Sequence, residues 1–418
     1  MISPDYIRNN RKEVQEGVRA KKSDIRIDDI IALDDEYKQV LRTTEDLRAS
    51  RNTITEQIAA QKNSEARSGL LKKAEEIKRK VQHNESILRT KKEALDTALH
   101  KIPNIPSNDV PRGTDEDDNV VLRVFGEKPS FSFKPKDYLE IAKAYDLIDI
   151  DRAAKVSGTR FGYIKNQAAL LEFALVRFVF DEVMKERFVP IVPPVLINKN
   201  AMQGLGYLEK DSDEAYYIEK DDLYLVATAE HSIVPMFCNE VIECETLPRR
   251  FIGFSSAFRR EAGSYGKDTK GILRVHQFDK IEMVSFATVE QAEKEHLLML
   301  ETQERLMQRL EIPYRVVSIC TGDMGFVAKR QYDIESWIPS QETYRETHST
   351  SDTGDFQARR LNIRYRKDKA NHFVHIANGT ALAIGRILIA LLENYQQHDG
   401  SVRIPSVLQP YTGFDRIS

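Results

Sequence analysis

Two series of residues at heptad spacing constrain the fold more than any other feature of this sequence. In both, the steps alternate between four and three residues. The first series is Leu33, Tyr37, Val40, Thr44, Leu47, Arg51, Ile54 and Ile58; the second is Leu70, Ala74, Ile77, Val81, Asn84, Leu88, Lys91, Leu95 and Ala98. This spacing is typical of helices that pair along a narrow seam. The polar stretch QKNSEARSG separates the series, so the sequence predicts a helical hairpin over about residues 27–100 with its turn in that stretch.

The hairpin is predicted to end at IPNIPSNDVPRG, because three prolines prevent the helix from continuing. The chain has 418 residues, more than one hydrophobic core usually supports. We therefore expect an N-terminal domain over 1–110, a linker over 111–120 and a larger domain over 121–418.

The second part has a different pattern, in which helical stretches such as NQAALLEFALVRFVFDEVMKERF alternate with strand-like runs. These runs, among them LYLVA, RRFIGFSSAFR and GILRVHQFDKIEMVSF, come in hairpin-like groups rather than in regular strand–helix repeats. That grouping favours an α+β fold with an antiparallel sheet flanked by helices.

Composition excludes several classes of protein. Cys238, Cys244 and Cys320 are too few for a disulfide framework and lack the spacing of zinc ligands, so no zinc is expected. The N-terminus MISPDYIRNN has no apolar signal-peptide core. The best apolar run, ALAIGRILIALLE, is short and interrupted by Arg386, whereas a membrane span needs about 20 apolar residues. A cytoplasmic protein is expected.

The hairpin carries a local charge that the formal net charge of −3 hides. Between residues 62 and 92 there are ten lysines and arginines against four glutamates. Such a surface suits contact with nucleic-acid phosphates, because each cation displaces counterions from the backbone. A solvated coiled-coil surface is the alternative, and charge by itself leaves both open.

No phosphate-binding glycine loop occurs in the chain, so nucleotide chemistry must rest on side chains. The richest segment is AFRREAGSYGKDTKGILRVHQFDKIEM. Its Arg259 and Arg260 offer planar forks that suit phosphate or carboxylate. Glu261, two residues after Arg259, is expected on the same strand face, where it would orient that arginine or bind a base amino group. A surface ion pair is the alternative.

Three further segments carry polar groups: TAE over 228–230, Glu282 in the strand after the loop, and NGTALAIGR with Arg386. In the last, the small residues Gly379 and Gly385 allow a backbone or a ligand to approach closely. Each segment by itself is also compatible with a structural role, because a buried glutamate is usually paired and Arg386 would serve as such a partner.

Taken in order, these segments resemble the signature motifs of class II aminoacyl-tRNA synthetases. RFVPIVPPVLIN is similar to the first motif, a helix and strand at the dimer interface; FRRE with VHQFDKIEM to the second; and NGTALAIGR to the third. The hairpin, TAEH, DFQARR and the final RIPSVLQPY resemble the bacterial-type seryl-tRNA synthetases. The resemblance covers essentially the full chain.

The resemblance implies an ATP site with Mg²⁺. Arg259, Arg386 and Glu346 would be catalytic, and Glu346 would help to hold the metal, which prefers one or two carboxylates plus phosphates. Phe278 would stack beneath the adenine. The ATP contacts implied in this way are Arg259, Arg260, Glu261, Val275, Phe278, Glu346, Thr347, His348, Ser349 and Arg386.

The resemblance likewise implies a serine pocket, formed by Thr228, Ala229, Glu230, Arg259, Glu282 and Thr380. An ammonium group needs a carboxylate, and a site built to bind a hydroxyl rejects the analogue that lacks it. Two positions depart from the family pattern. Thr380 stands where serine is common, and ETHSTSD is unusual, so His348 is either a satisfied polar residue or an ATP contact.

The implied reaction is the formation of seryl-adenylate, release of pyrophosphate and transfer of serine to tRNA(Ser), with tRNA(Sec) as an additional substrate by family habit. The hairpin would bind the tRNA, and the enzyme would be a homodimer. The alternatives are another class II synthetase of the threonyl or prolyl type, a paralogue that charges a carrier protein, and a catalytically dead RNA-binding homologue.

Overall fold

The computed structural model describes residues 1–208, 212–262 and 270–418. The chain divides into two compact units, 1–103 and 104–418, and each is described by itself.

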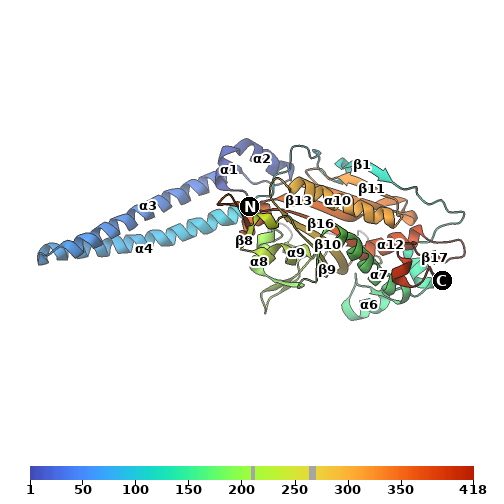
Figure 1. Cartoon of the computed structure of the whole chain (residues 1–418). Coiled ribbons are helices and arrows are strands. Elements are labelled where there is room, and N and C mark those ends of the chain that lie inside the picture. Colours follow the sequence, from blue (N-terminus) through green and yellow to red (C-terminus); the bar gives the residue numbers. More distant parts are fainter. Residues whose placement is uncertain (209–211, 263–269) are drawn as a thin grey trace. The chain divides into compact units, whose positions relative to one another are not determined.

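The first unit consists of two short helices and two long ones. Helices α1 (Pro4–Asn9) and α2 (Arg11–Ala20) precede α3 (Ile27–Ala60) and α4 (Ser64–His100). The long helices run side by side as an antiparallel pair (Figure 1). Among the predicted seam residues of α4, Val81 and Leu95 are buried and the others are half-buried, whereas most of the residues between them are exposed. The predicted coiled-coil hairpin is confirmed.

Two details of the hairpin differ from the prediction. The turn is restricted to residues 61–63, and the rest of the polar stretch is helical. The reason is the Asn63 side chain, which accepts hydrogen bonds from the backbone N–H groups of Glu65 and Ala66 and so starts α4 early. Arg51, placed in the first seam, is exposed, because a long arginine side chain keeps its charged head in water.

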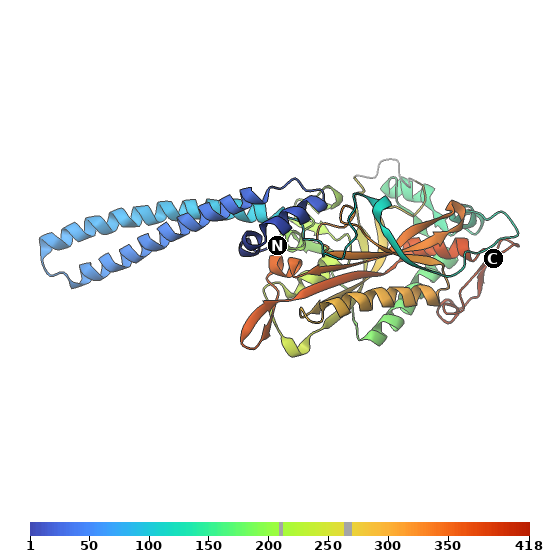
Figure 2. The ribbon, with the colours of Figure 1, turned by 90° about the horizontal axis from the view of Figure 1, so that it is seen from above.

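The second unit is built on an eight-stranded sheet (Figure 2). All neighbouring strands are antiparallel except β4 and β9. In spatial order the strands are β1 (Val120–Phe125), β11 (Tyr314–Ser318), β12 (Arg330–Ile338), β13 (Thr343–Gly354), β16 (His375–Ala383), β10 (Gln277–Ala287), β9 (Arg249–Phe258) and β4 (Val189–Ile191). The predicted α+β class with an antiparallel sheet is confirmed.

Shorter strands form four small sheets around the main one. They are β15 (Ala370–Phe373), β14 (Arg364–Lys367) and β8 (Val241–Glu243); β17 (Val402–Arg403) and β18 (Arg416–Ile417); β2 (Ile148–Asp149) and β3 (Tyr163–Ile164); and β5 (Leu196–Asn198), β7 (Leu223–Leu225) and β6 (Tyr217–Ile218).

The helices of this unit are α5 (Tyr138–Ala144), α6 (Ile150–Ser157), α7 (Asn166–Val183), α8 (Lys199–Leu205), α9 (Glu230–Ile233), α10 (Ala292–Arg309), α11 (Phe356–Leu361), α12 (Ile384–Asn394) and α13 (Gln409–Thr412). Single turns of 3₁₀-helix lie at Glu116–Asp118, Met184–Glu186, Ser212–Glu214, Val234–Phe237, Cys244–Thr246 and Pro339–Gln341.

The two faces of the main sheet have different coverings. Because side chains alternate along a strand, Ile281 and Met283 of β10 enter the core formed with α7, α10 and α12. Val284 and Phe286 enter a second core with α8, α9 and α11. The second face is therefore covered only in part, and its uncovered portion, around Glu282, forms the floor of a cavity.

Among the described residues, no helix is both long enough and apolar enough to cross a lipid bilayer.

Candidate functional site: a polar cavity on the antiparallel sheet

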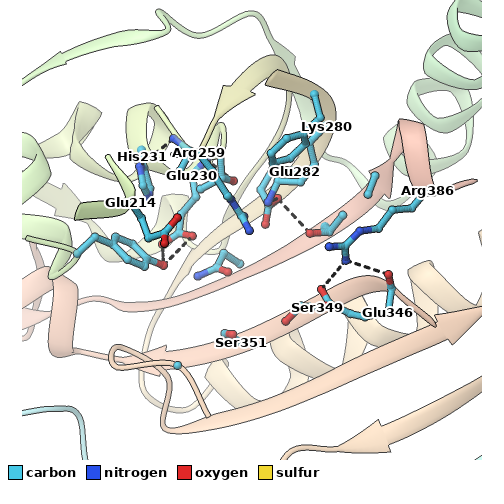
Figure 3. A pocket seen from close by; sticks show the side chains of 18 of the residues that line it. Glu214, Glu230, His231, Arg259, Lys280, Glu282, Glu346, Ser349, Ser351 and Arg386 are labelled. Atoms are coloured by element: carbon cyan, nitrogen blue, oxygen red, sulfur yellow. Dashed lines mark hydrogen bonds and ion pairs between the residues drawn. The ribbon is translucent and has the colours of Figure 1, made fainter. Parts of the chain in front are cut away.

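A cavity of about 670 Å³ opens on the partly covered face of the sheet (Figure 3). Most of the predicted site residues line it, although they come from segments up to 158 residues apart. The predicted residues in its wall are Thr228, Glu230, Arg259, Glu261, Val275, Phe278, Glu282, Glu346, Thr347, Ser349, Thr380 and Arg386.

Strands β10 and β16 supply the floor. The alternation along β10 points Phe278, Lys280 and Glu282 into the cavity. Thr380 of β16 lies opposite Glu282 in the strand register, and its hydroxyl donates to the Glu282 carboxylate at 3.3 Å. The residue before it must be small, since a Cβ on Gly379 would stand 2.8 Å from the Thr350 hydroxyl. The strand geometry therefore presents a carboxylate and a hydroxyl together.

Lys280, which sequence reasoning missed, is the charge partner of Glu282. Its ammonium lies 2.6 Å from the carboxylate, and both side chains are almost completely buried. A buried carboxylate needs such a partner, because desolvation otherwise opposes its charge. The signal was available, since Lys280 and Glu282 stand two apart on a predicted strand and so share a face.

A second carboxylate, Glu230, begins α9 on the opposite wall and is 3% exposed. Its oxygens accept from the Tyr207 hydroxyl, at 3.3 Å to each, and from the Gln357 amide at 2.8 Å. Burial raises the pKa of Glu230 to about 7, with the negative charge of Glu282 adding to the effect and the bond from Gln357 opposing it.

His231, next to Glu230, is neutral over the working pH range. Burial lowers its pKa to about 3, and the positive charges of Lys280 and Arg259 act in the same direction. Its Nδ1 accepts from the backbone N–H of Ala227 at 3.3 Å, and its ring lies 4.6 Å from the ring of Tyr207. His231 therefore supports the wall without adding a charge beside Glu230.

Arg259 follows directly after β9 and is held by its backbone. Its N–H donates to the His276 carbonyl at 3.0 Å, and its own carbonyl accepts from His276 Nδ1 at 3.0 Å. The guanidinium lies 5.2 Å from the ring centre of Phe278, a distance typical of a cation–π contact. The backbone hydrogen bonds thus fix the position of the Arg259 main chain, and the contact with Phe278 helps to position its guanidinium group.

Glu261 reaches the cavity by another route than the one predicted. Strand β9 ends at Phe258, and Glu261 has a left-handed backbone with φ of 52°, so the expected shared strand face with Arg259 is wrong. The carboxylate instead binds Arg274, with 2.8 Å between Nη1 and Oε2. A strand pattern cannot show this, because the left-handed residue lies three positions beyond the end of the strand.

At the far end of the cavity, Arg386 of α12 contacts Glu346 of β13 twice. Its Nη1 lies 3.3 Å from the carboxylate and donates to the backbone oxygen of the same residue at 2.9 Å. The Glu346 side chain is half exposed, and the positive charges of Arg386 and Arg259 lower the pKa of its carboxyl.

Three predicted contacts are not brought to the cavity wall. Ala229 is fully buried between its two cavity-lining neighbours, and Arg260 is exposed and bonded through its backbone N–H to the Glu214 carbonyl. His348 is completely buried, with Nδ1 3.0 Å from the Thr347 hydroxyl, and burial lowers its pKa to about 3. The imidazole is therefore neutral and enclosed away from the cavity, with a partner for Nδ1 but, among the described residues, none for Nε2. The part of the motif loop over 263–269 lies outside the described residues.

The cavity also contains polar residues that sequence reasoning did not single out. They are Tyr207, Glu214, His231, Arg274, Lys280, Gln331, Ser351 and Asn378. Lys280 alternates with Phe278 and Glu282 along β10, so the strand period indicates it, whereas Arg274 precedes that strand and is not indicated by it. Tyr207 follows a short helix with no motif around it.

Comparisons with known proteins agree with this architecture. Residues 214–395 match the family described as "tRNA synthetase class II core domain (G, H, P, S and T)", and residues 1–106 match "Seryl-tRNA synthetase N-terminal domain". The sheet, its cavity and the three motif segments therefore define a class II aminoacyl-tRNA synthetase.

Relatives that match over the full length of the chain indicate which class II family it belongs to. The chain is 43% identical to a serine--tRNA ligase of Acidothermus cellulolyticus, with 99% of both chains covered, and 43% identical to one of Bacillus subtilis, with 99% and 98% covered. A crystal structure of seryl-tRNA synthetase from Pyrococcus horikoshii complexed with ATP matches with a TM-score of 0.94 at 39% identity, covering 100% of this chain and 99% of the other. This chain belongs to the seryl-tRNA synthetase family.

Proposed function

We propose that the chain is a serine--tRNA ligase that joins L-serine to the 3′ end of tRNA(Ser) in two steps. The serine carboxylate attacks the α-phosphorus of ATP, and pyrophosphate leaves. A ribose hydroxyl of the tRNA then attacks the carbonyl of seryl-adenylate, and AMP leaves. The observation that carries the proposal is the pairing, in one cavity, of two buried carboxylates with two arginines on a class II sheet.

The two carboxylates suit the two polar ends of serine. Glu282 has a built-in cation in Lys280 and a hydroxyl neighbour in Thr380, so it is suited to accept a bond from the serine hydroxyl. The Glu230 carboxylate accepts from the neutral donors Tyr207 and Gln357, so it is suited to the ammonium group, with Thr228 beside it. Alanine would leave the Glu282 end unpaired, which is the physical basis of its rejection.

The nucleotide lies, in this proposal, between Arg259 and Arg386. Arg259 neutralises the α-phosphate and the serine carboxylate, where charge develops in the transition state. Val275 and Phe278 form an apolar slot for the adenine, and Glu261 accepts from its amino group. Arg386 binds the outer phosphates once its carboxylate partner turns away. No covalent nucleophile is required, because positioning and charge neutralisation carry the reaction.

Mg²⁺ fits the donors at this end of the cavity. Glu346 and Ser349 line the same wall, and Mg²⁺ commonly uses one or two carboxylates together with substrate phosphates and water. Within residues 1–208, 212–262 and 270–418, no group of three His, Cys, Asp or Glu side chains is arranged to hold a metal by itself. Bound Mg²⁺ would neutralise phosphate charge, and Glu346 would hold it from the protein side.

The hairpin is proposed as the tRNA-binding arm, and tRNA(Sec) as a second substrate. Its lysines and arginines from 62 to 92 lie in the turn and along α4, and most of them are exposed. Some of them form i,i+4 pairs, such as Arg79 with Glu75 and Lys80 with Glu76, which are weak enough in water for phosphates to replace the glutamates. An arm of this kind reads RNA by shape.

We also propose that the enzyme works in the cytoplasm as a homodimer. Four large apolar side chains are unusually exposed on α7, on β4 and just after β4: Leu170, Phe173, Val189 and Val192, with Phe173 at 69% and Val192 at 85%. Large apolar side chains exposed to this degree are typical of an interface between subunits. Phe173→Glu should give a monomer in analytical ultracentrifugation.

The deciding experiment is charging of unfractionated tRNA with ATP, Mg²⁺ and labelled serine, alongside threonine, alanine and proline. Charging with serine alone is expected. If the folded enzyme charges with none of them, the carrier-protein or dead-homologue alternatives gain, and serine-dependent pyrophosphate exchange then distinguishes these two. Charging with threonine or proline instead would contradict the proposal.

A further inference from the structure

We propose that Tyr207 and Gln357 are positioning residues that hold the Glu230 carboxylate in a single orientation through uncharged hydrogen bonds, ready for the amino group of serine. This inference rests on the proposed function and assigns a role to two residues that no motif marks. Neither residue is among the predicted serine contacts.

The first observation is that the two donors come from separate elements and converge on one carboxylate. Tyr207 follows α8, and Gln357 lies in α11, 150 residues further along the chain. The Tyr207 hydroxyl is 3.3 Å from both oxygens of Glu230, and the Gln357 amide is 2.8 Å from Oε1. A carboxylate held from two sides cannot rotate freely.

The second observation is that the Gln357 amide has only one workable orientation. Its Nε2 donates to Glu230 and, at 3.4 Å, to the Leu205 carbonyl, and both of these partners are acceptors. Its oxygen lies 3.3 Å from the Thr353 hydroxyl, whose single proton is shared with the Ile376 carbonyl at 2.9 Å. A fully buried side chain tied on every side transfers its fixed position to Glu230.

The third observation concerns charge. The charged groups near Glu230 are Glu282, which raises its pKa, and Lys280, which lowers it. Arg259 is also close but acts on Tyr207 and His231. Lys280 is already committed to Glu282 at 2.6 Å. The direct partners of Glu230 are uncharged, so the negative charge of this carboxylate is left for the ligand rather than cancelled within the protein.

The substitution that tests this is Tyr207→Phe, which removes one oxygen and keeps the ring against His231. Serine-dependent pyrophosphate exchange is measured across pH 5.5–8.5, a range set by the pKa of about 7 for Glu230. We expect kcat/KM for serine to fall about 5- to 10-fold and the KM for ATP to stay within about 2-fold. In the wild type the hydrogen bond from Tyr207 lowers the pKa of Glu230, so its removal should raise that pKa. The acidic limb of the serine profile should therefore move to higher pH.

Gln357→Glu is the second variant. Glutamate has nearly the same shape as glutamine but replaces a donor by an acceptor. The fall in kcat/KM for serine should therefore exceed that of Tyr207→Phe, and the acidic limb should again move to higher pH. Tyr217→Phe is the matched control, because that hydroxyl binds Asp222 on an exposed hairpin at 2.8 Å. Circular dichroism melts show whether each variant is folded.

Three results separate the possibilities. An unchanged serine profile in folded Tyr207→Phe overturns the inference. Equal losses for serine and ATP with an unmoved acidic limb also overturn it, since they indicate a merely structural role. If the wild-type enzyme itself shows no serine-dependent exchange, the proposed function fails, which is a different outcome from either of these.

Discussion

The hairpin and the cavity are built on opposite principles. In α3 and α4 few side chains are fully buried, and the outward-facing residues have the repetitive polarity of a solvated coil. In the cavity, ionisable side chains such as Glu230, Lys280 and Glu282 are nearly inaccessible to solvent, and each forms a hydrogen bond or an ion pair within the protein. The surface of the hairpin should tolerate substitution one residue at a time, whereas the cavity should not, because a buried charge that loses its partner is costly.

The sharpest test of this contrast is Glu282→Ala. It removes the predicted partner of the serine hydroxyl and leaves the Lys280 ammonium buried without its counter-charge. Serine-dependent pyrophosphate exchange should fall by about 10³-fold or more. Glu290→Ala is the matched control, since Glu290 pairs with Lys367 at the surface and its loss should have little effect. Near-normal exchange by Glu282→Ala would mean that the serine pocket lies elsewhere.

Shortening the hairpin tests the other side. Arg48 and Glu85 face each other at 2.8 Å, so residues 49–84 can be replaced by a short glycine-containing turn without separating the helices. Charging of tRNA should fall about 10²-fold because phosphate contacts are lost. Pyrophosphate exchange should be unaffected. A parallel loss of exchange in the folded, shortened protein would show that the two regions are not functionally separate.

Substitution of two lysines in the hairpin tests the same phosphate contacts with a smaller expected effect. Replacing Lys72 and Lys73 together by alanine should raise the KM for tRNA about 3- to 10-fold at low salt, and the difference should shrink as salt increases. Lys12→Ala, an exposed lysine in α2, controls for a general loss of charge. A salt-independent effect would argue for disturbed helix packing instead of phosphate contact.

The smallest expected effect concerns stability. Burial, together with the neighbouring Asp279, raises the pKa of Glu172 in α7 to about 8. The stability that this proton supplies is therefore complete below the unfolded pKa of about 4.5 and is lost as pH rises through 8. Glu172→Gln cannot titrate, so the melting temperature of the wild type should fall more between pH 6 and 9, by about 2 °C. Parallel melting curves for the two proteins would contradict the assignment.

Periodicity predicted the parts of the molecule in which one repeat runs undisturbed. The heptad series located the helical hairpin, and the hairpin-like strand groups indicated the antiparallel sheet. Prediction was wrong in two places where a local feature interrupted the repeat. The hydrogen bonds of the Asn63 side chain start α4 early, and the backbone of Glu261 is left-handed. Neither a helix-capping side chain nor a single left-handed residue changes the periodicity of the sequence.

Within the cavity, motifs identified the residues that face one another across neighbouring strands, such as Glu282 and Thr380. They did not identify partners that depend on the tertiary fold. Gln357 approaches Glu230 only because α11 packs against α8 beside α9. The neutrality of His348 likewise follows from its burial, which a motif letter does not reveal.

The double contact between Arg386 and Glu346 has a consequence for how the nucleotide enters. The carboxylate and the backbone oxygen belong to the same residue, so when the carboxylate turns to another partner the guanidinium keeps its second anchor. An arriving triphosphate therefore meets an arginine whose conformational entropy has already been lost during folding. In the proposed function, the free enzyme thus holds the Arg386 guanidinium in a nearly finished orientation, and nucleotide binding exchanges one anion for another rather than ordering a mobile side chain.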